Sequence, residues 1–280
     1  MHFMKITEAG EYTRIQNYTL HDTEAHKRKR AKRKNKTADF VKRYNHKMKV
    51  DKLQYLIMLN FTRGYFVTLK YFQDKHPDTY KAADKAMMEL VKGIKRECKQ
   101  KGKSFKYIAV TERGRLNNAL HHHLIVNSYG MVRELIGRWN EYGYIDIEPI
   151  EEDESAFRYL AEYICKDATK EELPSGKSSY HVSRNLEHPK VTITVSTEAW
   201  QEDPKAPEGY QVMPESIVNG FNESVGVRYQ SYMIKRKREP KEHKEEQEAH
   251  RRNRILLGNT LKKLFKKRPR AAGRQQGSRI

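Results

Sequence analysis

Residues 120–126 read Leu-His-His-His-Leu-Ile-Val, and about 35 residues later residues 159–166 read Tyr-Leu-Ala-Glu-Tyr-Ile-Cys-Lys. On a β-strand, successive side chains alternate between the two faces, so His121 and His123 point the same way and His122 points to the opposite face. The first stretch therefore predicts a strand with two imidazoles on one face. That pair is a candidate platform for a metal ion.

The second stretch is predicted to lie on a helix over residues 154–168, which begins with acidic residues as helices favour. At about 100° per residue, one apolar stripe of this helix gathers Phe157, Leu160, Ala161 and Ile164. Tyr159, Tyr163 and Lys166 follow at i, i+4 and i+7 on nearly the opposite side, toward a ligand or solvent. Two phenols and an ammonium on one exposed stripe indicate chemistry on an anion.

Strand and helix signals alternate around these two stretches. Strands are predicted over residues 64–70, 106–112, 121–127 and 144–150, with one more over 227–234, and helices over 80–101 and 131–140. The polar loop 113–118 is short, which favours an antiparallel strand pair and brings Glu112 beside the histidines. The order of elements predicts an α+β fold, a central antiparallel β-sheet flanked by helices.

Charge defines the kind of partner that the chain expects. The formal net charge is +20 over 280 residues, and both ends are strongly basic, at residues 27–36 and 261–280. This balance predicts a polyanionic partner, most plausibly nucleic acid. No apolar run approaches the roughly 18 residues of a membrane span and no secretory signal opens the chain, so we expect a cytoplasmic protein without a membrane partner. With only two cysteines, a disulfide framework is not expected.

The histidine strand and the tyrosine helix together resemble the signature of the HUH endonucleases, specifically the rolling-circle replication initiators of plasmids and small phages. In that family a His-hydrophobic-His strand binds a divalent metal, and a helix carrying Tyr-x-x-x-Tyr-x-x-Lys provides the nucleophile. Residues 66–71 resemble the first family motif, residues 107–114 the strand that carries the metal-site glutamate, and residues 180–185 a sequence common in Gram-positive members. The resemblance spans about residues 60–196. His122 departs from it, because this position is usually bulky and apolar, which leaves open which two histidines bind metal.

The resemblance implies roles for the residues that match its motifs. Glu112, His121 and His123 would bind Mg²⁺ or Mn²⁺, although by ligand type the set also suits zinc or iron. Tyr163 would be the nucleophile, Tyr159 a second one, and Lys166 would stabilise phenoxide or the transition state. Attack would leave a 5′-phosphotyrosine and a free 3′-hydroxyl for a polymerase, with religation by strand transfer.

Single-stranded DNA is expected to follow a basic groove with aromatic stacking. The candidate DNA contacts are Lys70, Tyr71, Arg113, Arg115, His181 and Arg184, and in the basic block Lys27, Arg28, Lys29 and Arg30. We expect a basic N-terminal arm over residues 1–50, a nuclease domain over 51–200 and a charged, basic C-terminal extension over 201–280. The sequence has no phosphate-binding Gly-Lys-Ser/Thr loop, so unwinding is expected to need a host helicase, with a host polymerase extending the 3′ end.

Two other functions fit the same residues. A transposase or conjugative relaxase would use the same chemistry on other DNA. A non-catalytic nucleic-acid-binding protein would use the fold and the basic ends but keep the histidines in its core. The basic block alone is equally compatible with a solvated or disordered tail.

Overall fold

The computed structural model of the chain describes residues 1–19, 39–114, 118–127, 129–165, 180–196, 201–222, 226–237, 248, 251–252 and 255. Residues Met1–Lys237 form one compact unit and Arg238–Ile280 a second. All the elements considered below belong to the first unit. Within the described residues, no helix has the length and apolar character required to cross a membrane.

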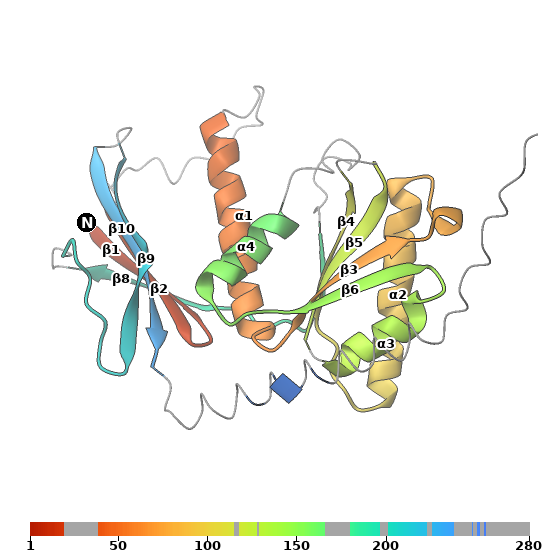
Figure 1. The fold of residues 1–280 in the computed structure, drawn as a ribbon. Helices are drawn as coiled ribbons and strands as arrows, with labels where there is room; N and C mark the ends of the chain where they lie inside the picture. Colours follow the sequence, from red (N-terminus) through yellow and green to blue (C-terminus); the bar gives the residue numbers. More distant parts are fainter. Residues whose placement is uncertain are drawn as a thin grey trace, which may run out of the picture. The chain divides into compact units, whose positions relative to one another are not determined.

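The histidines lie in an antiparallel five-stranded sheet, which we call the site sheet (Figure 1). Its strand order is β6-β3-β5-β4-β7. The strands are β3 (Tyr65–Tyr71), β4 (Tyr107–Arg113), β5 (Leu120–Val126), β6 (Gly143–Pro149) and β7 (His181–Val182). The predicted central antiparallel sheet is thereby confirmed, and β4 and β5 form the expected antiparallel pair.

Four α-helices accompany the sheet: α1 (Asp39–Asn60), α2 (Tyr80–Gln100), α3 (Tyr129–Trp139) and α4 (Glu154–Ile164). Two of them begin at side-chain caps, because Thr79 accepts a hydrogen bond from the Ala82 amide and Asp153 accepts one from the Ala156 amide. These caps explain why the predicted starts of α2 and α4 agree with the structure to within a residue.

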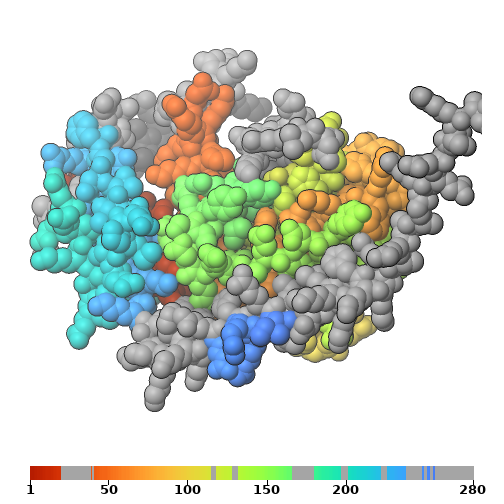
Figure 2. Space-filling view, viewed as in Figure 1, coloured from red at the N-terminus to blue at the C-terminus, as the bar shows by residue number. Residues whose placement is uncertain are grey.

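The helices cover both faces of the site sheet. Ile108, Val110 and Ile125 pack in one core with the apolar stripes of α1 and α4, whereas α2 and α3 contact the other face. Figure 2 shows α1 in orange and α4 in green lying directly against each other. The buried stripe of α4 is the one that the sequence predicted, since Phe157, Leu160, Ala161 and Ile164 are all buried.

A second antiparallel sheet has the order β8-β1-β2-β10-β9 and is built from both ends of the first unit. Its strands are β1 (His2–Ala9), β2 (Tyr12–Thr19), β8 (Lys190–Ser196), β9 (Tyr210–Asn222) and β10 (Val227–Arg236). Of these, the sequence predicted only β10. The expectation that residues 1–50 form a charged arm is therefore wrong for residues 2–19, and the predicted boundary at residue 50 falls inside α1. The basic block 27–36 lies outside the described residues.

Candidate active site

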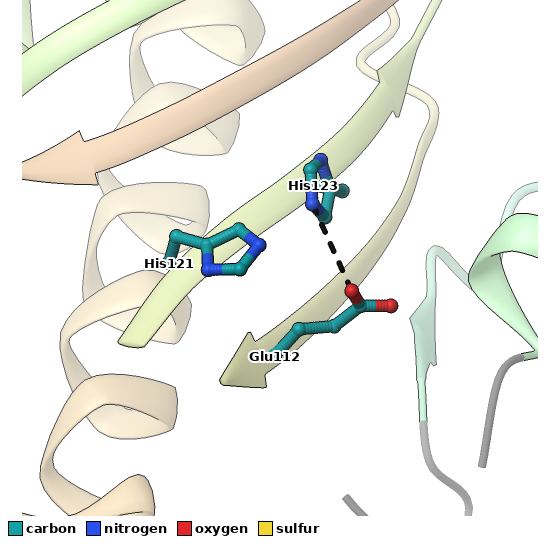
Figure 3. A group of neighbouring side chains, drawn as sticks. All are labelled: Glu112, His121 and His123. Atoms are coloured by element: carbon teal, nitrogen blue, oxygen red, sulfur yellow. Dashed lines mark ion pairs between the residues drawn. The ribbon is translucent and has the colours of Figure 1, made fainter. Parts of the chain in front are cut away.

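Glu112, His121 and His123 converge on one face of the site sheet (Figure 3). Glu112 on β4 stands directly opposite His121 on β5, and His123 follows two residues later on the same face. One ligand atom from each residue lies within 4.8 Å of the other two. Glu112 and His123 are buried, and His121 is half-buried. The antiparallel register thus produces the residue triad that the sequence predicted, which we call the triad.

The ring nitrogens of the two histidines are oriented by neighbouring groups. The His121 Nδ1 lies 3.2 Å from the carbonyl oxygen of Ala119, which can only accept, so Nδ1 carries the proton and Nε2 keeps its lone pair. The His123 Nδ1 bonds to the Thr68 hydroxyl at 3.1 Å, and its Nε2 lies 3.9 Å from Glu112 Oε2. Burial lowers the pKa of His121, which favours the neutral imidazole. Neutral imidazoles and a carboxylate suit a divalent cation, so the residues fit the ion that the resemblance implies.

His122 lies on the opposite face of the sheet and is fully buried. Its Nδ1 bonds to the Thr111 hydroxyl at 3.0 Å and its Nε2 to the Tyr71 hydroxyl at 2.6 Å. Burial lowers the pKa of His122 to about 3, so the ring is neutral at physiological pH. Both ring nitrogens are therefore engaged within the fold, and His121 and His123 are the two histidines that share a face with Glu112.

Tyr163 of α4 reaches the triad. Its hydroxyl oxygen lies 3.0 Å from His123 Nε2, the same nitrogen that faces Glu112. The ring packs edge-on against Phe66 and His123, with centroid distances of 5.6 and 4.8 Å. Tyr159, one turn earlier, is 64% exposed, and its ring centroid is 6.2 Å from that of Tyr163. The two tyrosines therefore occupy different environments, and only Tyr163 contacts the triad. Lys166 lies outside the described residues.

A buried ion cluster, which the sequence analysis missed, anchors α4. Asp51 of α1 binds the Arg158 guanidinium of α4 at 2.5 Å and the Arg14 guanidinium of β2 at 3.3 Å. Nearby, the Gln54 amide donates to Glu154 Oε1 at 2.8 Å. The Asp51 side chain is only 8% exposed. The three ionic groups come from three elements distant in sequence, so no local spacing could have indicated them.

The structure separates the predicted DNA contacts into groups. Lys70 is exposed and stands opposite His121, and Arg184 is exposed near Tyr107. Arg113 follows Glu112 and donates to the Asn118 carbonyl at 3.3 Å. Arg115, Lys27, Arg28, Lys29 and Arg30 lie outside the described residues.

Tyr71 and His181 are placed differently from the other predicted contacts. Tyr71 bonds to His122 and packs against Trp139 of α3, and His181 forms an ion pair with Asp84 of α2 at 3.0 Å. Both side chains therefore face α2 and α3, on the side of the sheet away from the triad. This placement favours packing roles and speaks against their prediction as contacts of a strand bound at the triad.

With an α+β fold and a candidate metal-binding triad established, comparison with known families identifies the class of protein. Residues 64–168 match the model of the replication-associated protein family that is named for ORF2. The matched segment begins just before β3, ends just beyond α4, and contains the triad and both tyrosines. This match confirms, for this segment, the resemblance to replication initiators. No curated protein and no solved structure gave a significant match.

Proposed function

We propose that this protein initiates rolling-circle replication by nicking single-stranded origin DNA with Tyr163 as the nucleophile. The observation that carries the proposal is the 3.0 Å contact between the Tyr163 hydroxyl and His123 Nε2, within a triad of metal-ligating side chains. The replication-associated family match supports the same function. A core role for the histidines, as in a non-catalytic binding protein, accounts for His122 but not for the convergence of Glu112, His121 and His123.

Glu112, His121 and His123 are the residues that would hold a Mg²⁺ or Mn²⁺ ion. When bound, such an ion polarises a phosphate and offsets the charge that develops during displacement. The Thr68 hydroxyl and the Ala119 carbonyl fix the two imidazole rings in the orientation that directs Nε2 of each toward this position. The protein's contribution is thus a preformed set of ligands whose ring orientations do not depend on DNA.

Tyr163 supplies the covalent step. Its phenolic oxygen forms a bond to the phosphorus and the bond to the 3′ oxygen breaks; the phenol loses its proton and the departing 3′ oxygen gains one. The products are a 5′-phosphotyrosine and a free 3′-hydroxyl, which a host polymerase can extend. The reverse attack, by a 3′-hydroxyl on the phosphotyrosine, restores the phosphodiester without ATP. The edge-on contacts with Phe66 and His123 hold the phenol in place for both directions.

The proposal is tested by incubating the protein with single-stranded DNA from the origin of its own replicon, labelled on the 3′ side of the expected nick, in Mn²⁺ or in EDTA. We expect a labelled protein–DNA adduct that survives denaturing electrophoresis in Mn²⁺ and is absent in EDTA. Folded protein that binds this DNA but yields neither adduct nor nick in either condition would refute the nuclease and favour a binding module. A transposase or relaxase would form an adduct with its own DNA ends rather than with the replication origin.

Removal of the carboxylate is expected to weaken metal binding. Because Glu112 supplies the only anionic ligand of the triad, Glu112→Gln should lower the Mn²⁺ affinity more than about tenfold, as measured by isothermal titration calorimetry. The matched control is Glu148→Gln, an exposed carboxylate on the same face of β6, which should leave the affinity unchanged. Equal Mn²⁺ binding by the Glu112→Gln variant and the native protein would rule out the triad as the metal site.

A further inference from the structure

One row of side chains crosses four strands of the site sheet in register. Tyr144 on β6 pairs with Lys70 on β3, Lys70 with His121 on β5, and His121 with Glu112 on β4. Since neighbouring strands are about 4.8 Å apart, Tyr144 stands roughly 10 Å from His121 across the sheet. The row therefore leads from the triad through a lysine to an aromatic ring, all on one face.

The outer half of this row is exposed. Tyr144 is 55% exposed and Lys70 is exposed, whereas Ile125 and Ile108, two rows along the same face, are buried under α1 and α4. An exposed aromatic ring beside a cation is the combination that binds single-stranded nucleic acid, because the ring stacks on a base and the cation neutralises a phosphate. The net charge of +20 fits the same partner.

The backbone beneath Tyr144 and Lys70 is held rigidly. The Trp139 indole nitrogen of α3 donates to the carbonyl oxygens of both Lys70 and Tyr144, at 3.4 and 3.2 Å. Gly143, just before Tyr144, allows β6 to approach β3, since a Cβ at this position would lie 1.7 Å from the Lys70 carbonyl oxygen. The Tyr144 ring meets Phe72 edge-on at 4.9 Å. These contacts fix the two side chains relative to each other, as a binding surface requires.

Charge along β6 limits where a DNA strand can run. Asp146 and Glu148 lie further along the same face of β6 and are both exposed. Their carboxylates repel phosphates, so a strand that crosses this face is confined to the Tyr144 end.

We propose that Tyr144 and Lys70 form a subsite for single-stranded DNA next to the triad, in which Tyr144 stacks on a base flanking the scissile phosphate and Lys70 binds a neighbouring backbone phosphate. The Lys70 part was expected from the sequence; the stacking role of Tyr144 is new. This inference rests on the proposed function for the location of the scissile phosphate.

Binding is measured by fluorescence anisotropy with the origin oligonucleotide, in a Tyr163→Phe background that prevents cleavage. We expect Tyr144→Ala to weaken binding roughly 5- to 150-fold and Tyr144→Phe to keep most of the affinity, because phenylalanine retains the ring. The matched control is Tyr142→Ala, a 48% exposed tyrosine whose ring lies beside Trp139, and it should bind as the background protein does. Circular dichroism and Tm verify that each variant is folded.

Two further readouts separate stacking from charge. Replacing the bases one at a time with abasic sites should weaken binding at one position flanking the nick with Tyr144 and have little effect there with Tyr144→Ala. Lys70→Gln should reduce the slope of log affinity against log salt by about 0.7, whereas Tyr144→Ala should leave the slope unchanged. Unchanged affinity and an unchanged abasic profile in Tyr144→Ala would overturn the subsite. Because binding is measured without cleavage, a protein that never forms an adduct but responds in this way would refute the nuclease and keep the stacking surface.

Discussion

Tyr163→Phe is expected to lower the rate of covalent adduct formation at least about 1,000-fold, because phenylalanine keeps the packing against Phe66 and His123 but lacks the oxygen that would bond to phosphorus. The measurement is the Mn²⁺-dependent adduct on a denaturing gel. Mn²⁺ affinity and oligonucleotide affinity should change little, which distinguishes loss of the nucleophile from loss of the site.

The matched control is Tyr159→Phe on the same helix. Tyr159 is 64% exposed and only Tyr163 contacts the triad, so the first cleavage should proceed in Tyr159→Phe at close to the native rate. If Tyr159 serves as a second nucleophile, its loss should appear only in assays that require a second cleavage while the first strand is still attached. An adduct that persists in Tyr163→Phe and disappears in Tyr159→Phe would reverse the assignment.

Asp51→Ala is expected to lower the free energy of unfolding by about 3–5 kcal/mol, because it leaves the Arg14 and Arg158 guanidinium groups without the buried carboxylate that they share. Urea denaturation followed by circular dichroism measures the loss. Asp39→Ala is the control, since the ion pair between Asp39 and Lys42 is largely exposed and contributes little. Equal unfolding midpoints for the two variants would contradict a structural role for the Asp51 cluster.

The same variant should also affect the reaction through α4. Arg158 lies on the helix that carries Tyr163, so loosening its contact with Asp51 should lower the nicking rate while Mn²⁺ affinity stays near the native value. Asp51 is thereby expected to act as a positioning residue, whose effect on the nicking rate exceeds its effect on the metal site.

The sequence predicted the site sheet and the triad because both depend on local patterns. Alternation along residues 120–126 fixed the faces of His121 and His123, and the short loop after β4 fixed the antiparallel register that brings Glu112 to them. The caps at Thr79 and Asp153 marked where two helices begin. These signals are all contained within about ten residues of chain.

The second sheet could not be predicted in the same way. β1 pairs with β8, whose residues are nearly all exposed and therefore lack the alternation of buried and exposed positions that reveals a strand in a sequence. The Asp51 cluster depends on β2, α1 and α4 meeting in space. The stacking position of Tyr144 became visible only once the register of β6 on β3 was known.

The pairing of β2 with β10 sets the order in which the molecule can be completed during synthesis. The Asn17 amide donates to the Gln230 side chain, 213 positions later, so β2 lacks this neighbour until nearly the whole first unit has left the ribosome. The segment that carries the triad and Tyr163 is made earlier, but Arg14 on β2 reaches its final environment only when β10 arrives. A nascent or prematurely terminated chain should therefore hold its nucleophile helix loosely, which would protect the replicon from cleavage by incomplete copies of its own initiator.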